Sequence, residues 1–375
     1  MFRLSNIIKS TFEEEKVRTL DGAIAIWNFT NRCNLSCLHC YSKATVDSRD
    51  ALSTDEIVKT LDSMVKAGIK FIIFSGGEPL LRKDIFDIAQ ECKKRGIFTY
   101  LSTNGLYIDD KNLDNVVNNF NYVGVSIDGE PDIHDKFRGM KGSYQKSFEA
   151  VLKLMGKTEK VGIRFTLTKE TVKSLKFIFN LVEKYRIPKL YISHLVYSGR
   201  GLENQSMDLS KKERRRIVNF ILDKAFFYYK SKRKTEIVTG NMEQDAVMLL
   251  QRFIKNYPDL VEKLYEKLVR WGGNSAGVKL VNIDSFGNVK PDPFFPFSLG
   301  NIKERDFYDI WNDKNNPILN FLRSKPRPIE GRCKKCVFLN ICNGGSRSRA
   351  FSVYGDLSAE DPSCYLSDKE IRSFI

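Results

Sequence analysis

Long apolar runs are absent from this sequence of 375 residues, and histidine is scarce, with only three. No stretch approaches the roughly 20 consecutive apolar residues that a membrane-spanning helix needs. The first 16 residues are interrupted by Arg3, Lys9 and a run of three glutamates, so they lack the apolar region of a signal peptide. We therefore expect a cytoplasmic protein with no membrane span.

The eight cysteines lie mostly in two groups at close spacing. Such clustering is typical of metal ligands in a reducing compartment and not of disulfides.

Cys33, Cys37 and Cys40 form a CxxxCxxC pattern directly after an apolar run. A cluster of four irons needs four ligands, so three thiolates leave one iron open to bind another molecule. A structural zinc site completed by His39, or simply buried cysteines, are the alternatives.

The second group consists of Cys333, Cys336, Cys342 and Cys364. Four thiolates complete a cluster of four irons and leave no open position, which predicts an auxiliary [4Fe–4S] cluster for electron transfer or structure. A structural zinc ion held by the same four residues is the alternative. Cys92 stands alone within a predicted helix, where we expect it to be a small buried side chain.

The net charge is +15, from 61 Lys and Arg against 46 Asp and Glu, and it favours anionic partners. Nucleic acid, a membrane surface and a small polycarboxylate all fit this charge. Two basic runs, 211–216 and 230–234, flank a predicted helix, where a solvated helical face is the ordinary explanation. The charge alone therefore identifies no substrate.

Strand-like and helix-like segments alternate over the first 200 residues. Continuous apolar strands followed by helices are typical of a parallel sheet covered by helices, which right-handed crossovers curl into a barrel or part of one. We predict an α/β fold with strands at 23–29, 70–75, 97–102, 122–127, 161–167 and 189–195, and helices at 53–68, 84–95, 112–119, 143–155 and 171–185.

The alternation stops near residue 200, where long helices are predicted for 203–271. A glycine-rich turn then leads into a hairpin-like stretch at 279–289. We therefore predict four parts: a lead-in at 1–22, an α/β domain at 23–200, a helical connecting segment at 201–271 and a C-terminal module at 272–375.

Polar motifs follow several of the predicted strands, at the edge of the sheet where ligands bind in such folds. Gly76 and Gly77 allow a ligand to approach the backbone closely, and the Glu78 carboxylate can hold an ammonium group. Ser126 and Asp128 stand in a Ser-Ile-Asp-Gly sequence after the fourth strand. Taken singly, each could equally be a turn or a helix cap.

The CxxxCxxC pattern followed by Tyr41, Gly-Gly-Glu-Pro and Ser-Ile-Asp-Gly resembles the radical S-adenosylmethionine (SAM) superfamily. The resemblance implies a partial (β/α)6 barrel and a [4Fe–4S] cluster on Cys33, Cys37 and Cys40 whose open iron binds SAM. It also implies SAM contacts from seven residues: Gly76, Gly77, Glu78, Asn104, Ser126, Asp128 and Arg138. The planar fork of Arg138 suits the SAM carboxylate.

The C-terminal motifs at 272–277, 287–292 and 333–365 are similar to the haem-biosynthesis branch of this superfamily, with a SPASM/twitch-type iron–sulfur module. The resemblance implies an iron tetrapyrrole substrate derived from siroheme, and loss of acetate groups from 12,18-didecarboxysiroheme to give Fe-coproporphyrin III. A 5′-deoxyadenosyl radical would abstract hydrogen from an acetate side chain. A low-potential donor such as ferredoxin or flavodoxin would supply electrons.

Three other functions stay open. Propionate modification in d1-haem synthesis shares the same motifs. A peptide or cofactor maturase is disfavoured because many such proteins carry more C-terminal cysteines than the four found here. A basic nucleic-acid-binding protein would hold zinc and would not need the glycine-rich motifs, so we expect no nucleic-acid partner.

His194, at the end of the sixth strand, is a candidate ligand for a substrate iron, although a capping role is the ordinary explanation.

Overall fold

The computed structural model describes residues 1–13 and 22–373. Their ten strands form one sheet in the order β10-β9-β8-β1-β2-β3-β4-β5-β6-β7. All neighbours from β8 to β7 are parallel, and β9 and β10 continue the sheet in antiparallel fashion. The strands are β1 (Ala23–Thr30), β2 (Ile69–Gly76), β3 (Phe98–Thr103), β4 (Tyr122–Ser126), β5 (Val161–Leu167), β6 (Lys189–His194), β7 (Glu236–Gly240), β8 (Leu280–Ile283), β9 (Asn288–Lys290) and β10 (Gly300–Asn301).

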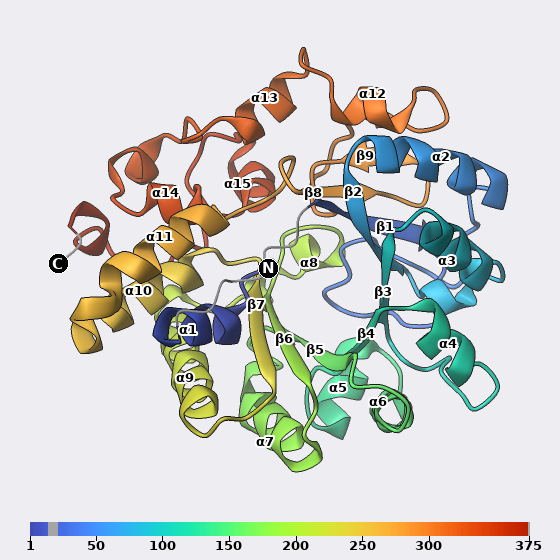
Figure 1. The fold of residues 1–375 in the computed structure, drawn as a ribbon, viewed down its shortest axis with the longest axis horizontal. Helices are drawn as coiled ribbons and strands as arrows, with labels where there is room; N and C mark the ends of the chain where they lie inside the picture. The colour runs from blue at the N-terminus through green and yellow to red at the C-terminus, as the bar shows by residue number, and fades with distance from the viewer. Residues whose placement is uncertain (14–21, 374–375) are drawn as a thin grey trace.

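Helices cover the outer face of the curved sheet, which confirms the predicted barrel-like α/β domain (Figure 1). The connections between the first six strands hold α2 (Thr54–Lys66), α3 (Ile85–Lys94), α4 (Leu113–Asn119), α5 (Pro131–Arg138), α6 (Ser143–Met155) and α7 (Leu175–Tyr185). The start of α2 is set by Ser53 and Glu56, whose side chains bond each other's backbone N–H groups in a capping box. Burial of one apolar stripe per helix against the strands then forms the core.

The segment after residue 200 differs from the prediction in one element. It contains α8 (Arg200–Glu203), α9 (Lys211–Lys230), α10 (Gln244–Asn256) and α11 (Val261–Trp271), but also β7, which pairs with β6. The prediction of helices alone missed β7 because five residues between two long helices are too few to show a period. The sheet therefore has a seventh parallel strand along the predicted barrel.

The N-terminal residues form a helix, α1 (Leu4–Phe12), that the sequence did not reveal. Phe2 bridges to Thr239 of β7, and Phe12 stacks on Tyr229 of α9 with ring centroids 4.9 Å apart. The described lead-in therefore packs against the end of the sheet. Residues 14–21 of this predicted segment lie outside the described residues.

The C-terminal module continues the sheet before it folds into short helices. The predicted hairpin is confirmed by β8 and β9, but β8 also pairs with β1 in parallel. The module then holds α12 (Phe307–Trp311), α13 (Pro317–Arg323), α14 (Leu339–Cys342) and α15 (Arg347–Tyr354). In Figure 1, α12 lies beside α2, and α14 lies beside α10 and α11.

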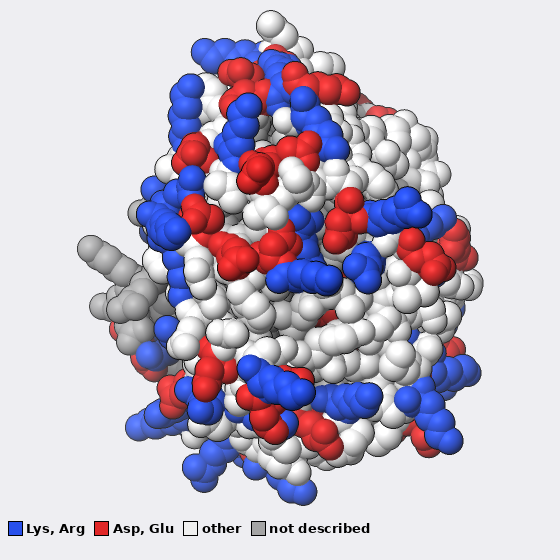
Figure 2. Space-filling model, turned by 90° about the vertical axis from the view of Figure 1, so that its right-hand side faces the viewer, with Lys and Arg blue, Asp and Glu red and all other residues white. Residues whose placement is uncertain are grey.

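Surface charge and helix character bear on the predicted partners. On the face shown in Figure 2, Lys and Arg side chains lie among Asp and Glu side chains, without a continuous basic surface. Among the described helices, none combines the length and apolar character that crossing a bilayer requires.

Candidate active site

A loop after β1 carries the first three cysteines, and Arg200 of α8 and Asn204, directly after α8, bond to its backbone. The Arg200 guanidinium donates to the Cys37 carbonyl at 2.7 Å and to the Ala44 carbonyl at 3.3 Å. Asn204 donates to the Leu38 carbonyl at 3.0 Å. Buried backbone carbonyls need such partners, so these bonds fix the loop in a single conformation.

The three thiols form a soft donor set at one site. Burial raises the pKa of Cys33 to about 12 and also raises that of Cys37. Cys37 and Cys40 raise the pKa of Cys33 further, and Cys40 raises that of Cys37. Metal binding would overcome this shift because it requires and stabilises thiolates. In the described part of the chain, no three His, Cys, Asp or Glu side chains are placed to hold a single metal ion. Three thiols beside a cavity fit an iron–sulfur cluster with one open iron.

A cavity of about 260 Å³ lies between this loop and the carboxyl ends of the strands. Sequence analysis predicted eight of its lining residues: Cys33, Cys37, Cys40, Gly76, Gly77, Asn104, Ser126 and Arg138. Their strands end at the same edge of the sheet, as parallel strands with right-handed crossovers require. The predicted cluster site and most of the predicted SAM contacts therefore lie together.

The glycine pair allows β2 to pass close to the cysteine loop. A Cβ atom on Gly76 would lie 2.3 Å from the Thr30 carbonyl oxygen, and one on Gly77 would lie 2.0 Å from that of Arg32. The Gly77 N–H donates to the Thr30 carbonyl at 2.8 Å. The two glycines therefore serve the packing of the cluster loop as well as the access of a ligand.

Glu78 is fully buried and lies behind the cavity wall. Its carboxylate accepts hydrogen bonds from Thr103 Oγ1 and from the Asn104 N–H, both at 2.8 Å. Burial raises the pKa of Glu78 to about 7. The carboxyl group therefore joins the ends of β2 and β3, and it positions Asn104 on the cavity wall.

Asp128 is also buried behind the wall, where it holds Arg138. Arg138 Nε donates to Asp128 Oδ2 at 2.7 Å, and its Nη1 lies 3.7 Å from Cys37 Sγ. Asp128 Oδ1 accepts from the Thr166 N–H at 2.7 Å. The Arg138 guanidinium, despite burial, keeps the pKa of Asp128 below its usual value. A fixed cation therefore lies between the cluster loop and the end of β4.

Each of the three histidines contacts another side chain or the backbone. The His39 ring stacks on Phe137 with centroids 4.4 Å apart, and burial lowers its pKa to about 3. Burial lowers the pKa of His134 to about 4, and its Nδ1 accepts from the Asp128 N–H. His194 lines the cavity, with Nε2 3.1 Å from Asp245 Oδ2. Its proposed role as a ligand of a substrate iron stays a prediction.

Four of the remaining five cysteines lie near one another in the C-terminal module, and the fifth, Cys92, lies in α3. Cys342 and Cys364 are buried, and Cys333 and Cys336 are half-buried. Burial raises the pKa of Cys342, and the charges of Cys364, Cys336 and Cys333 raise it further, so the four thiols share one site. This donor set fits an auxiliary [4Fe–4S] cluster with no open iron.

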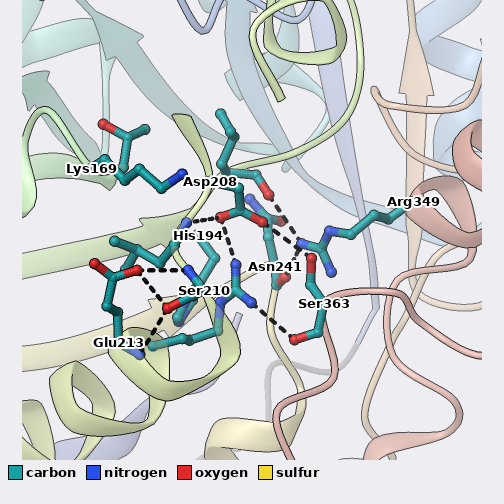
Figure 3. Close-up of polar contacts among 12 residues, drawn as sticks. Lys169, His194, Asp208, Ser210, Glu213, Asn241, Arg349 and Ser363 are labelled. Atoms are coloured by element: carbon teal, nitrogen blue, oxygen red, sulfur yellow. Dashed lines mark hydrogen bonds and ion pairs between the residues drawn. The ribbon is translucent and has the colours of Figure 1, made fainter. Parts of the chain in front are cut away.

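Buried polar contacts join this second site to the barrel (Figure 3). Arg349 forms an ion pair with Asp361 at 2.8 Å and donates to the carbonyls of Leu195 and Asn241. Ser363, next to Cys364, donates to Asp208 Oδ2 at 3.2 Å. The segment that carries the last cysteine is therefore attached directly to the edge of the sheet where the cavity opens.

Sequence reasoning missed several cavity residues. Glu243, Asn274 and Asp292 complete the wall beyond β6, and Arg164 of β5 lies inside it. No spacing in the sequence connects them, because β7 and β8 bring them together from distant segments.

Comparisons with known proteins agree with this geometry. Residues 27–182 match the model of the radical SAM superfamily, and residues 275–337 match that of the SPASM iron–sulfur cluster-binding domain. The chain is 37% identical to pre-heme d1 synthase of Dinoroseobacter shibae, over 99% of this chain and 93% of that protein. It is also 37% identical to Fe-coproporphyrin III synthase of Methanosarcina barkeri, over 93% of this chain and 89% of that protein.

Solved structures show the same fold. SuiB of Streptococcus suis bound to S-adenosylmethionine superposes with a TM-score of 0.70 at 17% identity, covering 92% of this chain and 78% of that one. The enzyme anSMEcpe with bound AdoMet and a peptide gives 0.69 at 19% identity, covering 93% and 94%. The matched families imply a SAM-binding [4Fe–4S] cluster and an auxiliary cluster. The chain therefore belongs to the radical SAM superfamily, as a radical SAM enzyme with a C-terminal SPASM domain.

Proposed function

We propose that this enzyme acts on an iron tetrapyrrole in haem biosynthesis and removes acetate groups from 12,18-didecarboxysiroheme to give Fe-coproporphyrin III. The observation that carries the proposal is the 37% identity to Fe-coproporphyrin III synthase over 93% of this chain. The number of C-terminal cysteines, enough for one auxiliary cluster, also favours it over a peptide maturase.

A basic side chain in the cavity supports a substrate with carboxylate groups. Arg164 stands 4.6 Å above the ring of Tyr191, and none of the described carboxylates forms an ion pair with it. Stacking holds the guanidinium plane and leaves its N–H groups to bind a carboxylate in bidentate fashion. We assign Arg164 to a substrate side chain.

The remaining residues position the reactants. When bound, the reduced cluster and SAM supply the ability to remove a hydrogen atom from an unactivated carbon. Cys33, Cys37 and Cys40 would hold the cluster, and Arg138 would hold the SAM carboxylate. Gly76, Gly77, Asn104 and Ser126 would line the SAM site, while Glu78 and Asp128 would act through the neighbours that they hold. Fixing these groups before reaction lowers the entropy cost of the transition state.

We propose that the predicted parts divide the work. Residues 23–200 would carry SAM chemistry, 201–271 would close the cavity, and 272–375 would hold the auxiliary cluster, with 1–22 as a lead-in whose described residues, 1–13, pack against β7 and α9. A low-potential ferredoxin or flavodoxin would deliver electrons in the cytoplasm, where thiols stay reduced. All eight cysteines are free of disulfides, which supports that compartment.

The test is anaerobic reconstitution followed by incubation with SAM, reductant and 12,18-didecarboxysiroheme. We expect 5′-deoxyadenosine together with a tetrapyrrole that has lost its acetate groups, identified by mass spectrometry. Formation of 5′-deoxyadenosine with an unchanged tetrapyrrole would contradict the substrate assignment while leaving the superfamily untouched.

The second candidate is propionate modification in d1-haem synthesis. It is favoured by the 37% identity to pre-heme d1 synthase over 99% of this chain. The same incubation separates the two functions, because loss from a propionate and loss of an acetate give products of different mass.

A further inference from the structure

Two acids stand on the wall of the cavity beside the cysteine loop, although both lie far from that loop in sequence. Glu243 lies between β7 and α10, and Asp292 follows β9. Both line the cavity, with only 8% and 4% of their surfaces exposed. Neither takes part in the SAM site described above.

One carboxyl oxygen of Glu243 has no partner. Its Oε1 accepts from Asn274 Nδ2 at 3.1 Å, whereas Oε2 is buried without a hydrogen bond among the described residues. Leaving a buried polar atom unpaired costs free energy, so such atoms need an explanation. Because Glu243 lines the cavity, a bound molecule can supply the missing partner.

The surroundings of the two acids raise both of their pKa values. Asp292 Oδ1 accepts from the Phe294 N–H at 2.8 Å. Burial raises the pKa of Asp292 to about 7, and the charge of Glu243 contributes. Burial also raises the pKa of Glu243, as does Asp361, against the opposing charges of the Met1 amino group and Arg349. Burial and nearby carboxylates therefore favour the protonated form of both groups.

We propose that Glu243 is the proton donor that completes acetate release, with Asp292 as the group that restores its proton. The inference rests on the proposed function, because it assigns a residue to the departing side chain of the tetrapyrrole. In this proposal, the partner of the unpaired Glu243 Oε2 is the departing CH2–COO group of the substrate.

The balance of atoms and electrons requires such a donor. The product gains a ring double bond where the substrate carried the acetate, so the hydrogen atom must leave from the adjacent ring carbon. Abstraction from the acetate itself, as the resemblance first suggested, would place the unpaired electron on the departing group and form no ring double bond. The bond from the ring to the methylene then breaks homolytically, with one electron entering the new double bond and one staying on the fragment.

The fragment, •CH2–COO⁻, becomes acetate by taking one electron and one proton. The electron comes from the low-potential one-electron donor that the reaction already requires. The proton comes from Glu243, which is protonated again from solvent through Asp292. The methyl group of the released acetate therefore contains one hydrogen that exchanges with water.

The first test follows this hydrogen. Holoenzyme incubated in D2O with SAM, reductant and 12,18-didecarboxysiroheme should release acetate with one deuterium in its methyl group, CH2D–COO⁻, measured by mass spectrometry. Acetate without deuterium would overturn the assignment and leave the proposed function intact. SAM cleavage without any acetate would overturn both.

The second test changes the donor. Glu243→Gln keeps the side-chain shape and an oxygen that can accept from Asn274, but it cannot act as an acid. We expect acetate release to slow by about 100-fold or more, while 5′-deoxyadenosine still forms and the iron content is unchanged. Asp292→Asn should slow release about tenfold. Glu262→Gln on the exposed face of α11 is the matched control and should behave as wild type.

An infrared measurement needs no turnover. At pH 7 the wild-type protein should show a protonated carboxyl C=O band that shifts in D2O and is reduced in the Glu243→Gln variant. A variant that releases deuterated acetate at the wild-type rate would overturn the proposal, as would an infrared spectrum identical to that of wild type.

Discussion

Cys37 is the most buried of the three loop cysteines, and contacts from two directions fix it. Arg200 binds its carbonyl, and Arg138 Nη1 lies 3.7 Å from its sulfur. A residue held in this way has little freedom to move toward a different ligand. The Cys37 thiol is therefore held at one position, where it can serve as a cluster ligand.

Cys37→Ala should remove one of the two clusters. We expect iron to fall from about eight to about four atoms per chain, and 5′-deoxyadenosine formation to disappear. Iron and sulfide analysis of the anaerobically reconstituted protein measures the first effect, and chromatography of the SAM products measures the second. Cys92→Ala, on the buried face of α3, is the control: it should keep all the iron and lower the free energy of unfolding by about 1 kcal/mol.

Arg138→Lys tests the SAM carboxylate assignment while it keeps a positive charge opposite Asp128. Lysine cannot bind two oxygens in a planar fork, so we expect the KM for SAM to rise about tenfold. Full deletion would be less informative, because an unpaired buried Asp128 would cost about 3–5 kcal/mol. An unchanged KM in a variant with normal iron content would exclude Arg138 from the SAM site.

For single residues, the sequence predicts which side chains share a site when they lie close together along the chain. The spacing of Cys33, Cys37 and Cys40 lies within one loop, so the three residues were found together. Glu243 and Asp292 are 49 positions apart, and only the pairing of β7 with β6 and of β8 with β1 brings them to one cavity. Glu78 was placed in the right motif, but its burial behind the wall depends on Thr103 and the neighbouring strand.

The end of β2 shows how a strand and a loop share one close contact. Gly77→Ala would place a methyl group 2.0 Å from the Arg32 carbonyl oxygen, so the cysteine loop would have to shift. A displacement of this kind costs about 100-fold in rate, and we expect at least that loss in 5′-deoxyadenosine formation.

Gly96→Ala is the control that replaces a glycine without creating a steric clash. Gly96 has a φ of +71°, but nothing lies within 4 Å of a Cβ built there. We expect a loss of about 1–2 kcal/mol in stability from the backbone conformation and normal SAM cleavage. Equal losses of SAM cleavage in the two variants would contradict the steric explanation.

Helix α9 offers a test that involves stability alone. Ser210 and Glu213 form a capping box at its start, with the Ser210 hydroxyl accepting from the Glu213 N–H at 3.3 Å. Ser210→Ala should lower the free energy of unfolding by about 1 kcal/mol, seen as a lower denaturant midpoint, with unchanged SAM cleavage. A capping variant that lost activity at full iron content would reveal a functional role for this helix end.

Helices and strands were predictable where the segment was long enough for its hydrophobic periodicity to be recognised. The helix predicted at 53–68 is present as α2, and its capping box of Ser53 and Glu56 is a signature that lies within four consecutive residues. In contrast, β7 has five residues, and its identity as a strand comes from the neighbouring β6 and from Phe2. Tertiary pairing, and not local preference, decides such a segment.

In the whole molecule, the auxiliary-cluster module is connected to the barrel through buried charges. Arg349 and Asp361 are almost fully buried, and Arg349 also binds two carbonyls of the barrel segments. Arg349→Ala should leave Asp361 unpaired and cost about 3–5 kcal/mol. Faster amide hydrogen exchange in residues 344–366 would localise the effect, whereas Arg216→Ala at the exposed surface should leave exchange unchanged.

The pairing of β8 with β1 has a consequence for synthesis on the ribosome. The strand that precedes the cluster loop receives one neighbour early, from β2, but its second neighbour is translated only some 250 residues later. At about 5–20 residues per second this delay amounts to roughly 10–50 s. The β1 edge beside the cysteine loop therefore lacks its β8 neighbour during most of translation, and an unpaired edge strand can pair with other chains. We expect early cluster insertion and shielding of this edge to favour folding of the enzyme.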